Sequence, residues 1–142
     1  DDSASRGLGD VYKRQSMGGL MSIKTSILFP QFRNIISLSP AFWFGYPRVL
    51  KDVNNLSNES SIYLYTGKKE GHIFGDHVKN IFPNHWDLDF SNNDDFYYSG
   101  VKKIEDSLKS NNKTVIFSFQ ENGHHNETSW ATAILEILGK LI

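Results

Sequence analysis

The run Ser16-Met17-Gly18-Gly19-Leu20 stands at the start of an amphipathic segment. A serine followed by small residues before a helix is typical of the second half of a nucleophile elbow, the G-x-S-x-G turn between a strand and a helix. In that turn Gly18 would allow close packing of helix and strand, and the backbone N–H of Met17 would point at an oxyanion. The first glycine of the motif is absent, because Arg14 stands in its place. The run therefore predicts a strand-to-helix turn with Ser16 as candidate nucleophile.

The first fifteen residues differ in character from the rest. The run Asp10-Val11-Tyr12-Lys13-Arg14-Gln15 resembles the translation of a transposase adapter used in sequencing libraries. We therefore expect residues 1–15 to be a non-native leader and residues 16–142 to be the C-terminal part of a single domain, cut immediately before Ser16. On this interpretation Arg14 occupies a place where the end of a preceding strand is expected.

Composition places the chain among globular proteins. It has 142 residues, of which 39% are hydrophobic and 22% charged, enough for one domain with a core. A net charge of -1 gives no electrostatic reason to expect a nucleic-acid partner, and the absence of cysteine excludes disulfides and thiolate metal sites. No apolar run approaches the roughly 18 residues of a membrane-spanning helix, so no membrane partner is expected. The sequence leaves the oligomeric state open, and also the compartment, cytoplasmic or secreted.

Helical and strand patterns alternate along residues 16–142, with no internal repeat. Apolar spacing predicts helices over residues 17–28, 47–53, 97–108 and 130–141. Short β-branched runs predict strands over residues 34–38, 61–66 and 114–119. Residues 71–100, rich in Asn, Asp and aromatics, carry no clear pattern. This alternation predicts an α/β fold, with a parallel sheet covered by helices on both faces.

Three chemically complementary residues follow expected strands. Ser16 follows the position of the absent strand, Glu70 follows the second predicted strand, and His125 follows the third. Ligands gather at the carboxyl ends of parallel strands. A serine hydroxyl needs an imidazole to take its proton, and a carboxylate fixes the tautomer of that imidazole. The sequence thus predicts a Ser16–Glu70–His125 triad, with Asp76 as the alternative acid and His124 as the alternative base.

Four segments carry the combination of motifs on which a family resemblance rests. They are Ser16-Met17-Gly18-Gly19, Ser39-Pro40-Ala41-Phe42-Trp43, Tyr65-Thr66-Gly67-Lys68-Lys69-Glu70 and Gly123-His124-His125-Asn126-Glu127 followed by Trp130. Together they resemble the esterase family of α/β-hydrolases that includes enterochelin-type siderophore esterases, feruloyl esterases and mycolyltransferases. The resemblance covers the chain from Ser16 onward except residues 71–100, and it implies the C-terminal half of an α/β-hydrolase fold. It also implies the nucleophile's position for Ser16, the acid's for Glu70 and the histidine's for His125, which precedes Trp130 by five positions as in that family.

Other candidate site residues have structural alternatives. We expect Trp43 and Phe44, just past a strand end, to form the wall of a substrate pocket. The aromatic residues of the following segment either line that pocket or pack on one another, and both interpretations stay open; they are Phe74, Phe82, Trp86, Phe90 and Phe96 to Tyr98. Four residues that could bind a metal have no known metal-binding spacing; they are His72, Asp76, His77 and His85. No metal and no cofactor is therefore expected.

These observations lead to a ranked set of functions. The first is a serine hydrolase that cleaves a small-molecule carboxylic ester through an acyl-enzyme. The alternatives are an acyltransferase with the same triad and a non-catalytic binding module on the same scaffold. The Met17 N–H supplies one oxyanion donor and a segment preceding Ser16 is expected to supply the other, so the chain alone is expected to be nearly inactive. A free sheet edge should also make it prone to aggregate.

Overall fold

The computed structural model describes residues 16–82 and 87–141. The expected leader, including Arg14, lies outside the described residues. The first described element is a helix over residues 16–28, which ends before Pro30, as the sequence predicts. Proline cannot continue a helix, because it lacks the N–H and its ring clashes with the preceding turn.

A three-stranded parallel sheet forms the centre of the described fold. Its strands, in spatial order, are β1 (Asn34–Leu38), β2 (Ser61–Lys69) and β3 (Thr114–His124). Both pairings are parallel, so all three carboxyl ends lie at one edge. The predicted α/β fold class with a parallel sheet is therefore confirmed, and the described sheet is small and open.

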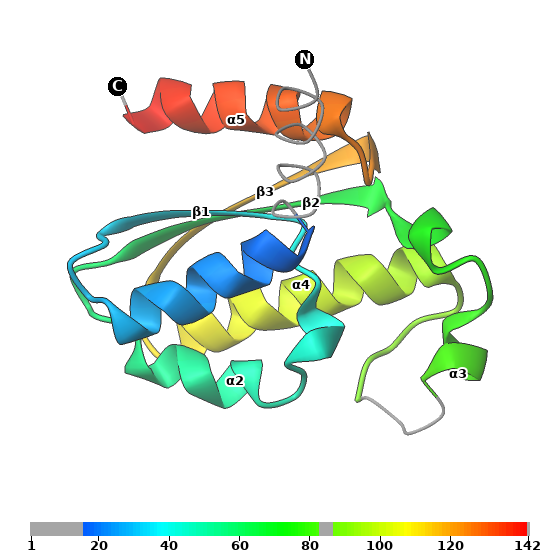
Figure 1. Cartoon of the computed structure of the whole chain (residues 1–142), viewed down its shortest axis with the longest axis horizontal. Coiled ribbons are helices and arrows are strands. Elements are labelled where there is room, and N and C mark those ends of the chain that lie inside the picture. The colour runs from blue at the N-terminus through cyan, green and yellow to red at the C-terminus, as the bar shows by residue number, and fades with distance from the viewer. Residues whose placement is uncertain (1–15, 83–86, 142) are drawn as a thin grey trace, which may run out of the picture.

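Helices cover both faces of this sheet (Figure 1). The first helix, α2 (Val49–Asp52) and α4 (Asn93–Ser110) lie on one face, while α5 (Glu127–Leu141) lies on the other. Short elements connect them: η1 (Phe42–Phe44), η2 (Val53–Asn55), η3 (Gly71–Phe74) and α3 (Val78–Ile81). Among the described residues, no helix is both long enough and apolar enough to cross a bilayer.

Each face of the sheet has its own hydrophobic core, because successive side chains of a strand point to opposite faces. The larger core joins β2 to the first helix and α4; its buried members include Leu20, Ile23, Ile62, Leu64, Val101, Ile104 and Leu108. The smaller core joins the other strand faces to α5; it contains Leu38, Tyr63, Tyr65, Trp130, Ala133 and Ile137. The sheet thereby lies between two layers of helix.

Candidate active site

A polar residue follows each strand at the carboxyl edge of the sheet. Ser39 comes directly after β1, Glu70 after β2 and His125 after β3. All three are buried, with exposed fractions of 3% or less. Glu70 and His125 are candidate site residues predicted from the sequence, whereas Ser39 is not among them. The signal was present, because Ser39-Pro40 follows a predicted buried strand just as Glu70 and His125 follow theirs.

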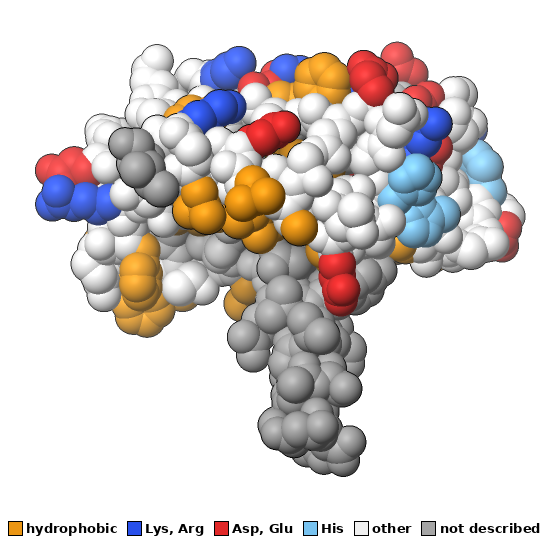
Figure 2. All heavy atoms as spheres, turned by 90° about the horizontal axis from the view of Figure 1, so that it is seen from above, with side chains coloured by type: hydrophobic (Ala, Val, Ile, Leu, Met, Phe, Trp, Pro, Cys, Tyr) orange, Lys and Arg blue, Asp and Glu red, His pale blue; other side chains and the backbone are white. Residues whose placement is uncertain are grey.

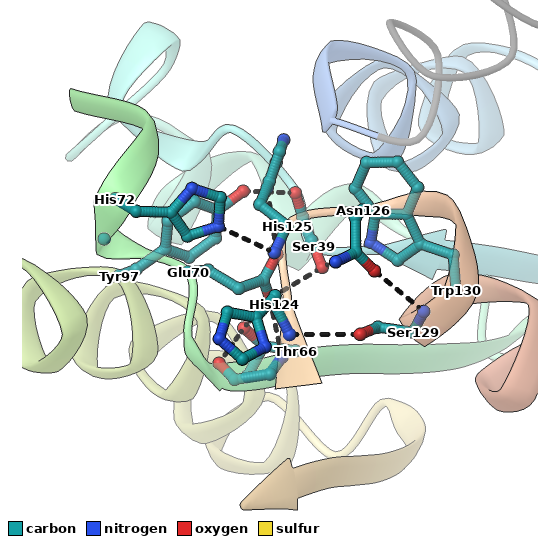
Figure 3. Close-up of polar contacts among 12 residues, drawn as sticks. Ser39, Thr66, Glu70, His72, Tyr97, His124, His125, Asn126, Ser129 and Trp130 are labelled. Carbon is teal, nitrogen blue, oxygen red and sulfur yellow. Dashed lines mark hydrogen bonds and ion pairs between the residues drawn. The ribbon is translucent and has the colours of Figure 1, made fainter. Parts of the chain in front are cut away.

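The Glu70 carboxylate is the centre of the hydrogen-bond network (Figure 3). Its Oε1 lies 2.9 Å from Nδ1 of His125. Its Oε2 accepts three hydrogen bonds, from the Ser39 hydroxyl at 2.8 Å, the Thr66 hydroxyl at 2.9 Å and the Gly67 N–H at 2.6 Å. A fully buried carboxylate is tolerated only with such partners. The two oxygens therefore have separate tasks: Oε2 anchors the group and Oε1 faces the imidazole.

The His125 imidazole is held on several sides. Its ring packs edge-on against Trp130, with centroids 4.9 Å apart, and lies 5.6 Å from the ring of Tyr97. Its backbone N–H donates to Nε2 of His72 at 3.2 Å. An ionised Glu70 only accepts hydrogen bonds, so Nδ1 of His125 must carry the proton in this pair. That tautomer gives Nε2 the lone pair that a general base needs.

A close approach of the neighbouring parallel strands β2 and β3, at an irregularity in their pairing, brings these two residues together. A Cβ added to Gly67 would lie 2.2 Å from the carbonyl oxygen of Gly123, and one added to Gly123 would lie 2.7 Å from the Tyr65 hydroxyl. The pairing register shifts between Gly67 and Lys69 at this point. Because neither Gly67 nor Gly123 has a side chain, the end of β3 approaches β2 closely and places His125 against Glu70.

Ser16 lies at the same end of the sheet, at the start of the described part of the first helix. Its carbonyl accepts a hydrogen bond from the Ala41 N–H at 2.9 Å, which ties it to the loop after β1. Ser16 itself is half-buried. Met17, the expected oxyanion donor, has a side chain that is 41% exposed. The structure thus joins Glu70 and His125 directly, whereas the roles of Ser16 and Met17 stay predictions.

A second glycine of the opening run makes the close helix–strand contact. A Cβ on Gly19 would lie 2.7 Å from the carbonyl oxygen of Leu38 in β1. The Gly19 carbonyl also accepts the Ser37 hydroxyl at 2.7 Å. The close-packing role predicted for Gly18 stays a prediction, and the close contact of the first helix with β1 is made by Gly19.

The alternative acid and the alternative base lie outside this network. Asp76 is exposed, and its carboxylate accepts from the backbone N–H of His77 and from the Asn80 amide, which orders its own loop. The side chain of His124 is exposed, and its ring lies 5.8 Å from that of His72. Figure 2 shows histidine side chains gathered near one end of the face seen there. Of the candidates weighed, Glu70 and His125 are the pair in direct contact.

The aromatic residues form a packed layer under the site. Trp43 contacts Phe74 and Tyr97, with ring centroids 4.8 and 5.2 Å apart, whereas Phe44 is 63% exposed. The described aromatics of the unpatterned segment also pack against the larger core; they include Phe74, Phe82, Phe90 and Phe96. Of the two alternatives, this favours packing on one another, and the pocket-wall role of Trp43 and Phe44 stays a prediction. Trp86 lies outside the described residues.

Metal ligands are not grouped in the described ranges 16–82 and 87–141. No cluster there brings together three or more His, Cys, Asp or Glu side chains in a geometry suited to a metal ion. His85, one of the four residues weighed from the sequence, lies outside those ranges.

Comparison with known proteins adds no relative to this picture. Neither a protein-family model, nor a curated protein, nor a solved structure matches the chain.

Proposed function

We propose that the chain carries the acid–base part of a serine hydrolase acting on carboxylic esters. Ser16 is the nucleophile, His125 the general base and then the general acid, and Glu70 the group that orients His125. The observation that supports this most is the buried contact of 2.9 Å between Glu70 and His125 at the carboxyl edge of the sheet. Such a pair presents a neutral imidazole with one fixed tautomer.

The proposed reaction has two proton transfers in each half. The Ser16 Oγ attacks the ester carbonyl carbon while its proton passes to Nε2 of His125, and the Met17 N–H donates to the oxyanion. The tetrahedral intermediate then breaks its C–O bond, and the leaving alkoxide takes the proton from Nε2. Water repeats the sequence on the acyl-enzyme, releasing the acid and restoring the Ser16 hydroxyl. Glu70 remains ionised throughout and stabilises the imidazolium.

Fluorophosphonate labelling tests the nucleophile. The probe is applied to the 142-residue chain and to a longer form in which residues 1–15 are replaced by the expected strand and loop, each beside Ser16→Ala. We expect labelling of the longer form that disappears in Ser16→Ala, with little ester turnover by the shorter chain. An unlabelled longer form with a folded circular-dichroism spectrum would overturn the proposal, together with its acyltransferase variant.

A further inference from the structure

Ser39 adopts a backbone conformation that serine rarely takes. Its φ is 44°, in the left-handed region, directly after β1 and before Pro40. A non-glycine residue persists there only when its surroundings determine it strongly. Its exposed fraction is 0%, so solvent does not stabilise this conformation. The reason for the conformation must lie in the contacts of the residue.

Three other elements hold Ser39 in place. Its N–H donates to the carbonyl of Tyr65 in β2 at 2.8 Å. Its carbonyl accepts from the Tyr97 hydroxyl of α4 at 2.6 Å, and its own hydroxyl accepts from the indole N–H of Trp130 in α5 at 2.9 Å. Every polar group of this residue is therefore engaged, and each partner comes from a different element.

These contacts leave a single direction for the Ser39 proton. The Trp130 indole nitrogen only donates hydrogen bonds, so the Ser39 Oγ must act as acceptor toward it. The Ser39 hydroxyl then donates to Oε2 of Glu70 at 2.8 Å. The result is a directed chain of two hydrogen bonds from Trp130 through Ser39 to Glu70.

We propose that Ser39 is a positioning residue that fixes the rotation of the Glu70 carboxylate, with Trp130 as its support. Thr66 and Gly67 also bind Oε2, but they belong to the same strand and turn as Glu70 and hold it only locally. Ser39 and Trp130 come from other elements, so they fix the carboxylate relative to the whole sheet. Since Oε2 is held in this way, Oε1 stays on Nδ1 of His125. The catalytic consequence rests on the proposed function, whereas the positioning itself does not.

Variants can remove the hydroxyl and keep the backbone. Ser39→Gly removes the hydroxyl and tolerates the left-handed conformation. Trp130→Phe removes the indole N–H together with part of the buried ring system, and keeps an aromatic ring beside His125. Ser37→Ala is the matched control, because Ser37 is another fully buried serine, two residues earlier, whose hydroxyl binds the Gly19 carbonyl instead of Glu70.

The primary readout is solvent exchange of the His125 Nδ1 proton, measured by NMR on the 142-residue chain. We expect Ser39→Gly to accelerate exchange about tenfold, the factor that corresponds to losing ~1.4 kcal/mol from a hydrogen bond to a charged group. Trp130→Phe should accelerate it by a smaller factor and Ser37→Ala should leave it unchanged. A folded Ser39→Gly or Trp130→Phe with wild-type exchange would overturn the proposal, as would equal acceleration in Ser37→Ala.

Fluorophosphonate labelling of the longer form then separates the two proposals. Slower labelling in Ser39→Gly at unchanged probe affinity links positioning to catalysis. Accelerated exchange in Ser39→Gly, together with no labelling of Ser16 by the probe, would support the positioning role of Ser39 and reject the hydrolase. Wild-type exchange in Ser39→Gly together with Ser16-dependent labelling would reject the positioning role of Ser39 and support the hydrolase.

Discussion

Tyr65 is a buried phenol next to the site, with an exposed fraction of 1%. Its hydroxyl donates to Oε1 of Gln120 at 3.1 Å. Burial raises the pKa of this phenol well above its ordinary value, and the charges of Glu70 and Glu136 raise it further. The folded chain therefore keeps the proton at a pH where the unfolded chain has lost it.

This difference predicts alkaline destabilisation. Above about pH 10 the unfolded state binds fewer protons than the folded state, so the free energy of unfolding falls with pH, by at most ~1.4 kcal/mol per unit for one phenol. Below that pH the contribution is constant. Urea unfolding at about pH 9 and about pH 11 measures the fall, and Tyr65→Phe should reduce it. Equal falls in both proteins would show that another group is responsible.

At the scale of residues, the sequence predicts the position of those side chains that directly follow a strand. Glu70 and His125 are found because parallel strands deliver the residues that follow them to one edge. The role of Ser39 cannot be predicted from the sequence, because it depends on a left-handed backbone and on hydrogen-bond partners from α4 and α5. Chemical type and strand order can be predicted in this way, whereas tertiary hydrogen bonds between distant side chains cannot.

Among the elements, the close approach of β2 and β3 at Gly67 and Gly123 matters most for the candidate site. We predict that Gly67→Ala lowers the free energy of unfolding by about 1–3 kcal/mol, because its Cβ would meet backbone, which cannot move aside as a side chain can. Gly139→Ala is the control: nothing lies within 4 Å of an added Cβ in α5, so it should stabilise by up to ~1 kcal/mol. Urea titration of both variants checks the two signs, and an unchanged free energy of unfolding in Gly67→Ala would contradict the close approach of β2 and β3.

Element boundaries show where periodicity stops being informative. The sequence places the start of a helix at residue 97, but α4 begins at Asn93, with the Asn92 side chain accepting from the Asp95 N–H. The first turn is polar, so the apolar pattern begins late even though an N-cap signal is present. Similarly, the strand expected over residues 114–119 continues to His124. Its last residues are mostly polar, so the apolar pattern ends early, and pairing with β2 keeps them in the strand.

In the whole described molecule, β1 is an edge strand. A groove of about 420 Å³ runs between this edge and the first helix, with Met21 and Phe32 among its lining residues. Both side chains are about half exposed, at 51% and 53%. An edge strand beside exposed apolar side chains favours pairing between chains.

We therefore predict that Phe32→Lys reduces concentration-dependent aggregation of the 142-residue chain. A charge beside the edge strand opposes pairing of one chain with another. Leu135→Lys, which replaces a 72% exposed leucine of α5 on the opposite face of the sheet, should have a smaller effect. Static light scattering over a concentration series measures both. Equal effects of the two variants would point to general surface charge as the cause.

The hydrogen bond between Ser39 and Trp130 joins residues 91 positions apart, and the one between Ser39 and Tyr97 spans 58. During synthesis on a ribosome the amino-terminal part of a chain emerges first. Ser39 and Glu70 therefore leave the ribosome well before Trp130 and His125, which are needed to satisfy them. Biosynthesis consequently brings Ser39 and Glu70 into solution before their later partners exist, and a nascent chain interrupted before His125 would contain Glu70 without the imidazole that its Oε1 faces.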